Sequence, residues 1–288
     1  MPRKKPDNHE IPQYYLKGFC ESHDPFLWVF ERNKPFDPGK KRGKNNPLWT
    51  SVSKIGLRAD GYGIIVPGEP PDFSFETKLQ RQEHIADIPI KKIRTFMVIN
   101  RHEKEIVVRY IGLMRKRLSR RDLTAKKILN TNINNLPWDY WQRELAFKGN
   151  FTRASEVTEA KKQLLTEPMQ TRLLRESMIM GYEMSQAALL EMTWNFLITP
   201  AYDYFVTSDN PVIFDENQGL AKSPLIFPVG KRVALLAQLK QSNDLSYRNI
   251  STEETKKINS IIIQTATKEL YSPESEKWIC ERLTIANP

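Results

Sequence analysis

The chain has 288 residues, of which 40% are hydrophobic and 27% are charged, and its formal net charge is +10. This composition excludes an intrinsically disordered chain, and the length is enough for one large domain or two small ones with a substantial core. The only two cysteines, Cys20 and Cys280, exclude a disulfide framework and favour a reducing compartment.

The patterns of apolar residues, taken in chain order, define three regions. Residues 1–72 are rich in proline and glycine and form a strand-and-loop region, residues 73–200 are mainly helical, and residues 201–288 hold strands and a closing helix. Helices are predicted at 73–118, 137–147, 155–166, 169–198 and 252–270, and strands at 26–30, 63–66, 204–207, 212–214, 225–229 and 233–239. The stretch STEE, from Ser251 to Glu254, predicts a capping box at the start of the last helix. We expect one α+β domain over residues 1–288, in which N-terminal and C-terminal strands meet in a small sheet.

The stretch HEIPQYYLKGF, residues 9–19, predicts a helix of less than two turns. Pro12 suits the first helical position, and Gly18 suits a left-handed residue just past the helix end. So short a helix is unstable alone, and therefore Tyr15 and its apolar neighbours are expected to hold it by tertiary packing.

His9 lies just upstream of this short helix, and two interpretations of it stay open. The positive end of the helix favours a neutral imidazole, which can act as a base or as a metal ligand. Alternatively, the ring ties down the N-terminal arm through hydrogen bonds.

Two glutamates flank the apolar stripe of the predicted helix over residues 75–93. Glu76 and Glu83 are seven residues apart and fall on one line at the edge of the stripe, where a carboxylate is partly desolvated and can face a cleft. They lie about 10 Å apart along the helix, too far to share a proton. Glu83 is the better candidate for a metal site, and an ion pair with a neighbouring lysine or arginine is the alternative.

The stretch TSDNPV begins at Thr207, directly after an apolar run. Asn210 before Pro211 is pushed away from helical geometry, and Asp209 can accept backbone N–H bonds, so Ser208 to Pro211 predict a turn. The end of a buried strand is also where a scaffold commonly presents an acid to a cleft. Asp209 is therefore both a turn residue and a candidate metal ligand.

Basic residues gather at 2–6, at 40–44 and at 115–121. The third cluster contains Arg115, Lys116, Arg117, Arg120 and Arg121. Such clusters attract polyanions, nucleic acid first and an anionic membrane surface second, although a solvated surface has the same pattern. Neither a secretory signal nor a membrane span is present in the sequence, so we expect a cytoplasmic protein.

The order of these motifs resembles the bacterial domain-of-unknown-function family 4238. An N-H-x-x-P-Q-x-Y-L-x-x-F opening maps onto Asn8, His9, Pro12, Gln13, Tyr15, Leu16 and Phe19, and T-S-D-N-P maps onto residues 207–211. One departure is PVGK at 228–231, where the family pattern has a hydroxyl side chain. The resemblance implies no established activity, but it groups His9, Gln13, Glu83 and Asp209 as a family pattern of polar residues.

Phosphate-loop, dinucleotide, esterase and zinc-protease motifs are absent from the sequence, and a carboxylate-rich site suits Mg²⁺ or Mn²⁺. The first hypothesis is a metal-dependent nuclease in which Asp209 and Glu83 bind the metal and His9 or Glu76 activates water or assists the leaving group. In this hypothesis Gln13 orients a phosphate and the basic cluster at 115–121 holds the strand. The second hypothesis is a non-catalytic nucleic-acid or protein-binding module in which the motifs are structural clasps. The third is a hydrolase or transferase acting on a small phosphorylated substrate.

Overall fold

The structure, a computed structural model, describes a large part of the chain. The described residues are 8–21, 25–36, 47–58, 74–116, 151–164, 166, 183–215, 217–218, 222–239 and 245–285. The strand predicted at 63–66 and the helix predicted at 137–147 lie outside them.

The chain divides into two compact units. The first comprises Met1–Gly61, Leu79–Leu118 and Tyr182–Pro288, and the second comprises Tyr62–Lys78 and Ser119–Gly181. Helix α6 (Phe151–Leu164) belongs to the second unit and agrees with the helix predicted at 155–166. The single domain expected for residues 1–288 stays a prediction.

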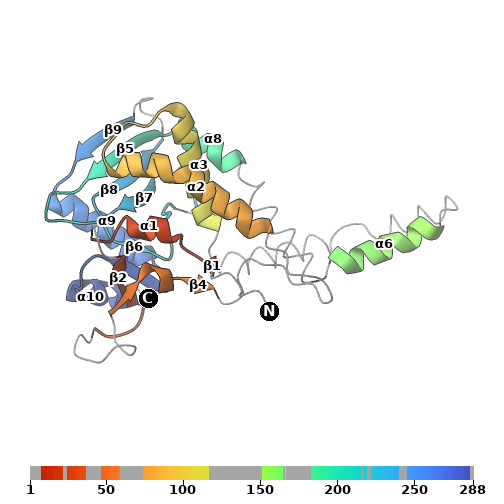
Figure 1. The fold of residues 1–288 in the computed structure, drawn as a ribbon, viewed down its shortest axis with the longest axis horizontal. Helices are drawn as coiled ribbons and strands as arrows, with labels where there is room; N and C mark the ends of the chain where they lie inside the picture. Colours follow the sequence, from red (N-terminus) through yellow and green to blue (C-terminus); the bar gives the residue numbers. More distant parts are fainter. Residues whose placement is uncertain are drawn as a thin grey trace. The chain divides into compact units, whose positions relative to one another are not determined.

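One antiparallel sheet joins the two ends of the sequence (Figure 1). Its order is β3 (Leu48–Ser51), β2 (Phe26–Glu31), β10 (Glu269–Ser272) and β6 (Thr207–Ser208). Strand β10 pairs with β2 on one side and with β6 on the other, so the C-terminal region supplies a central strand. Together with the helices, this sheet agrees with the expected α+β class.

A second sheet has the order β7 (Leu225–Gly230), β8 (Val233–Gln238), β5 (Thr193–Ile198) and β9 (Leu245–Asn249). Strands β7 and β8 confirm the predictions at 225–229 and 233–239. Strand β9 runs parallel to β5, whereas β8 is antiparallel to it. The third sheet of the described residues has two strands, β1 (Asn8–His9) and β4 (Leu57–Arg58).

The prediction of a helix over 169–198 is wrong at its C-terminal end, because helix α8 (Glu183–Glu191) stops and β5 begins at Thr193. The run TWNFLI is rich in aromatic and β-branched residues and is bordered by a partner strand on each side, which favours a central strand. The mainly helical middle is therefore not confirmed, since a strand lies within it at 193–198. The closing helix also ends early, because α9 (Thr252–Thr265) gives way to β10 before Leu270.

Helices α2 (Ser74–Arg94) and α3 (Arg101–Lys116) occupy the region predicted as helical at 73–118. A turn separates them, and α3 begins with a reciprocal cap in which the Asn100 side chain accepts from the Glu103 N–H and the Glu103 carboxylate accepts from the Asn100 N–H. Helix α9 begins with the predicted capping box between Ser251 and Glu254. Helix α10 (Lys277–Ile285) is the last element of the described residues.

The short N-terminal helix α1 (Gln13–Lys17) exists, but its ends differ from the prediction. Pro12 is the residue that precedes the helix, and Gly18 has a right-handed φ of −68° instead of a left-handed one. A Cβ atom at position 18 would overlap the guanidinium group of Arg94, so any other residue there has to displace this group. A Cβ atom at Gly230 would lie 2.9 Å from the Gly18 carbonyl oxygen, so the chain is closely packed on both sides of this point.

We predict that Gly18→Ala destabilises the protein by about 2 kcal/mol, since the new methyl group must displace the Arg94 guanidinium from the end of α1. Urea denaturation followed by circular dichroism measures the loss. Lys17→Ala, at the neighbouring exposed position, is the control and should change stability much less. Equal stability of the two variants would show that Arg94 moves aside without cost.

Candidate functional site

His9 and Gln13, the first two predicted site residues, are hydrogen-bonded to each other. His9 Nδ1 lies 2.8 Å from the carbonyl oxygen of Ile55, and Gln13 Nε2 lies 2.8 Å from His9 Nε2. A carbonyl oxygen only accepts, so Nδ1 carries the proton and donates it, and the amide of Gln13 donates to the unprotonated Nε2. Both ring nitrogens therefore have partners within the chain, as expected for a residue that fixes the N-terminal arm.

Tyr15 joins the two sequence motifs. Its hydroxyl donates to the Pro228 carbonyl oxygen at 2.7 Å, so the hydroxyl of Thr207, 2.8 Å away, donates to Tyr15 in turn. The side chain is completely buried, and this burial raises the pKa of Tyr15 well above its usual value. Tyr15 thus links α1 to β7 of one sheet and to β6 of the other.

The carboxylate of Asp209 holds the segment that leads into β10. Its Oδ1 accepts from the Thr267 N–H at 2.8 Å, and its Oδ2 accepts from the Lys268 N–H at 2.8 Å and from the Thr267 hydroxyl. The backbone N–H of Asp209 donates to the Glu269 carbonyl oxygen at 3.0 Å, and only 7% of the residue is exposed. Both carboxylate oxygens are therefore occupied by donors of the protein itself.

Ser208 and Asn210 make the turn that the sequence predicts. The Asn210 N–H donates to the Ser208 Oγ at 3.1 Å, and the Asn210 side-chain amide donates to the Thr265 carbonyl oxygen at the end of α9 at 3.3 Å. Pro211 then leads to the buried Val212. The whole TSDNP motif fastens β6 to α9 and β10.

Glu269 brings a second carboxyl group close to Asp209, and the sequence offered no signal for it. Burial raises the pKa of Glu269, and the negative charges of Asp209, Glu31 and Glu10 raise it further, while the hydrogen bond from the Tyr271 hydroxyl acts against them. Within the described ranges, no group of three or more His, Cys, Asp or Glu side chains is arranged to hold a metal ion.

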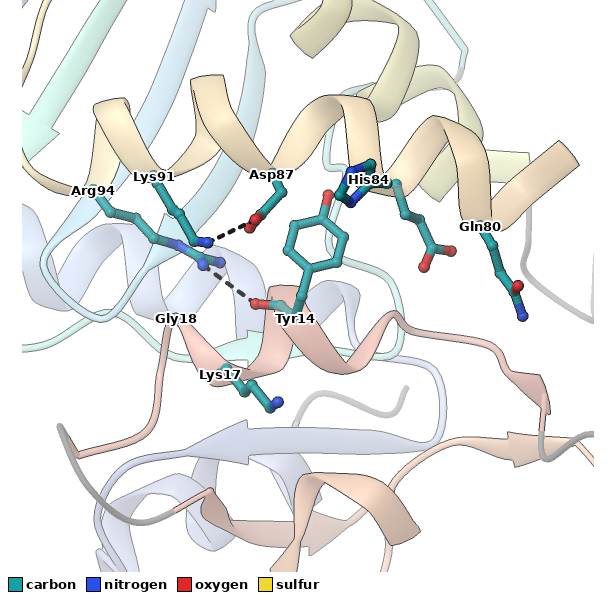
Figure 2. A pocket seen from close by; sticks show the side chains of 9 residues that line it. Tyr14, Lys17, Gly18, Gln80, His84, Asp87, Lys91 and Arg94 are labelled. Carbon is teal, nitrogen blue, oxygen red and sulfur yellow. Dashed lines mark hydrogen bonds and ion pairs between the residues drawn. The ribbon is translucent and has the colours of Figure 1, made fainter. Parts of the chain in front are cut away.

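Glu83 lies elsewhere, in a pocket of about 510 Å³ between α1 and α2 (Figure 2). The residues that line the pocket are Tyr14, Lys17, Gly18, Gln80, Glu83, His84, Asp87, Lys91 and Arg94. His9, Gln13 and Asp209 are not among them. The side chain of Glu76, at the start of α2, is outside the described residues.

The pocket has a mixed charge. Asp87 forms an ion pair with Lys91 at 2.6 Å, one helical turn away. Arg94 donates to the carbonyl oxygens of Tyr14 at 3.2 Å, Tyr15 at 2.9 Å and Val229 at 2.9 Å. Burial lowers the pKa of Arg94, and nearby tyrosines and Asp87 act in the opposite direction. Sequence patterns singled out Glu83 alone, because the residues opposite it come from α1, more than 60 positions away in the chain.

The basic cluster at 115–121 is described only at its start. Arg115 and Lys116 end α3, and the Arg115 guanidinium lies over the Phe214 ring at 4.2 Å from its centroid. Arg117, Arg120 and Arg121 lie outside the described residues. Arg115 therefore has a packing role, which does not depend on what Arg117, Arg120 and Arg121 bind.

These features define an α+β protein whose N-terminal helix is fixed to two sheets by the side chains of two distant motifs. A family model described as "Protein of unknown function (DUF4238)" matches residues 7–276, and the chain belongs to this family. No match is found among curated proteins or among solved structures. Among the described helices, none combines the length and the apolar character needed to cross a membrane.

We predict that Asp209→Asn destabilises the protein by about 2 kcal/mol. Each oxygen of the Asp209 carboxylate accepts a hydrogen bond from a backbone N–H, and in asparagine one of these oxygens becomes an NH₂ group, which donates and cannot accept. Asp215→Asn is the matched control, since Asp215 is exposed and, among the described residues, accepts a single hydrogen bond, from the Asn217 N–H. Urea denaturation of both variants decides the outcome. If Asp209→Asn is as stable as Asp215→Asn, the carboxylate does not act as a clasp.

Proposed function

We propose that this chain is a nucleic-acid-binding protein whose two motifs act as structural clasps. The observation that carries the proposal is the internal use of the motif side chains: His9, Tyr15 and Asp209 each bond to distant parts of the same chain. A formal net charge of +10, gathered in clusters along the sequence, supports nucleic acid as the partner because clustered cations attract polyanions.

A cytoplasmic location belongs to the same proposal. Its support is that Cys20 and Cys280 are free thiols and are both buried, which suits a reducing compartment.

The test is the salt dependence of binding to a labelled single-stranded RNA and to a DNA duplex, measured by fluorescence anisotropy. The variant replaces Arg117, Arg120 and Arg121 by glutamine, and it leaves Arg115 in place because that side chain packs on Phe214. Each lost phosphate contact lowers the slope of log affinity against log salt by roughly 0.7 to 0.9, so we expect the slope to fall by about 2.

The control for this experiment removes the same number of charges elsewhere. Arg101, Lys256 and Lys257 are exposed on α3 and α9, and replacing them by glutamine should leave the slope near that of the wild type. Equal slopes in the two triple variants would show that the basic cluster has no special part in binding. No measurable binding by the wild type would contradict the proposal itself.

Metal-dependent phosphodiester hydrolysis is the second candidate, and the position of Glu83 favours it. Glu83 lines a pocket that also contains Asp87 and His84, which are residue types that bind or assist Mg²⁺ and Mn²⁺. In this candidate Glu83 binds the ion in the pocket, whereas the partners that the sequence suggests for it, Asp209, His9 and Gln13, do not line this pocket. The hydrogen bonds already made by Asp209 and His9 argue for Glu83 as the first residue to test.

We predict for this candidate that Glu83→Gln lowers Mn²⁺-dependent cleavage of RNA and DNA by more than about 100-fold, since the ligand loses the charge that holds the ion. Glu253→Gln, at an exposed position of α9, is the control and should cleave like the wild type. Gel electrophoresis of end-labelled strands measures the rates. The candidate fails if the wild type does not cleave with either ion, or if both variants cleave equally.

A further inference from the structure

Three aromatic rings form a row at one edge of the sheet that joins the two ends of the sequence. Strand β3 is the edge strand, and its Trp49 lies directly opposite Trp28 of β2. Phe26 is two positions from Trp28 along β2, so the three side chains lie on one face of the sheet. The ring centroids of Trp28 and Trp49 are 5.0 Å apart, and those of Phe26 and Trp49 are 5.7 Å apart with the rings stacked. The three rings are therefore in contact with one another.

The covered part of this face ends at the row. Phe30 and Leu270, which lie opposite each other on the same face, belong to the apolar cluster that α9 and α10 complete. Trp28 packs against the border of this cluster, whereas Phe26 and Trp49 pack directly against neither of the two cores of the described residues. Both of these rings are partly exposed. Core packing thus does not account for them, and part of their surface is open to a flat partner.

We infer that this row of Phe26, Trp28 and Trp49, the aromatic row, binds unpaired bases of a single-stranded nucleic acid. Every base has a flat π-face, and a base stacks on partly exposed aromatic rings as a further member of the row. Bases inside a duplex are already stacked and paired, so the ligand is a single strand. The inference rests on the proposed nucleic-acid binding and names the part of the chain that contacts the bases.

Positive charge on both sides of β3 in the sequence favours nucleic acid over an uncharged flat partner. Lys54 is exposed and lies three positions after Ser51, the residue opposite Phe26, and its ammonium makes no hydrogen bond or ion pair with any residue that the structure describes. The sequence that connects β2 to β3 contains the basic cluster at 40–44. Sites for single strands combine aromatic side chains, on which the bases stack, with cations that bind the phosphates between them.

Binding to a strand with bases and to an abasic strand of equal length tests the inference. Aromatic pairs across two strands also stabilise a sheet, so a loss of binding does not by itself identify a base contact. The two DNA strands carry the same phosphates, and only the first has bases to stack. Measured by fluorescence anisotropy, we expect the wild type to bind the strand with bases at least about tenfold more tightly. Equal affinities for the two strands would overturn the inference.

Variants of Trp49 then assign the difference to the aromatic row. Trp49→Leu should weaken binding of the strand with bases about tenfold and leave the abasic strand unchanged, since leucine is apolar but has no ring to stack. Trp49→Phe keeps a ring and should retain most of the affinity. Tyr202→Leu removes an aromatic side chain that is 99% exposed elsewhere in the chain, and as the control it should bind both strands like the wild type. An unchanged affinity of Trp49→Leu, or an equal loss for both strands, would contradict a base contact.

The outcomes separate this inference from the proposed function. If circular dichroism shows that Trp49→Leu does not fold, Phe26→Leu replaces it and should weaken binding of the strand with bases about threefold. If the wild type binds neither strand, the proposed nucleic-acid binding fails together with the inference. If it binds both strands equally and the glutamine variant of Arg117, Arg120 and Arg121 lowers the salt slope, the chain binds phosphates and the aromatic row takes no part.

Discussion

The side chain of Arg94 holds the arrangement of α1, α2 and β7. Its guanidinium reaches from the last residue of α2 to two carbonyl groups of α1 and one of β7. A cation at the C-terminal end of a helix is favourable, and here it stabilises a helix of five residues that is too short to persist alone. The guanidinium group occupies the space that a Cβ atom at position 18 would take, and Gly230 lies close to the Gly18 carbonyl oxygen. One charged side chain therefore fixes where the N-terminal helix lies.

A polar motif can hold the fold together or take part in chemistry, and a sequence alone does not distinguish these two roles. Tyr15 and Thr207 lie in different motifs, 192 positions apart, yet they share one buried hydrogen bond. Asp209 in turn anchors the strand that pairs with β2. Removing one partner of such a bond leaves a buried polar group unpaired, which is costly whether or not any chemistry occurs nearby. Hence the bonds that the motif residues make within the chain give these residues a structural explanation.

Local signals in the sequence predicted the elements that depend on local physics. The strands at 26–30, 225–229 and 233–239, the capping box at Ser251 and the turn at Asp209 follow from short-range patterns, and the structure contains them. Strand β5 was missed because its strand character comes from two neighbours far along the chain. The same limit applies to the site: Glu83 was found from its place on one helix, but the pocket that it lines forms only when α1 packs on α2. The neighbourhood of Asp209 and Glu269 likewise depends on the pairing of strands.

The position of Tyr15 has a consequence for the order of events during synthesis. Its hydroxyl bonds to Pro228, 213 positions further along, and β2 pairs with a strand that starts at Glu269. Contacts of such large sequence separation form late, because the intervening chain must first be made and its ends brought together. On the ribosome, the N-terminal helix and the strand β2 leave the exit tunnel long before their partners exist. Part of the apolar surface of α1 and β2 therefore stays uncovered until the last quarter of the protein has been made.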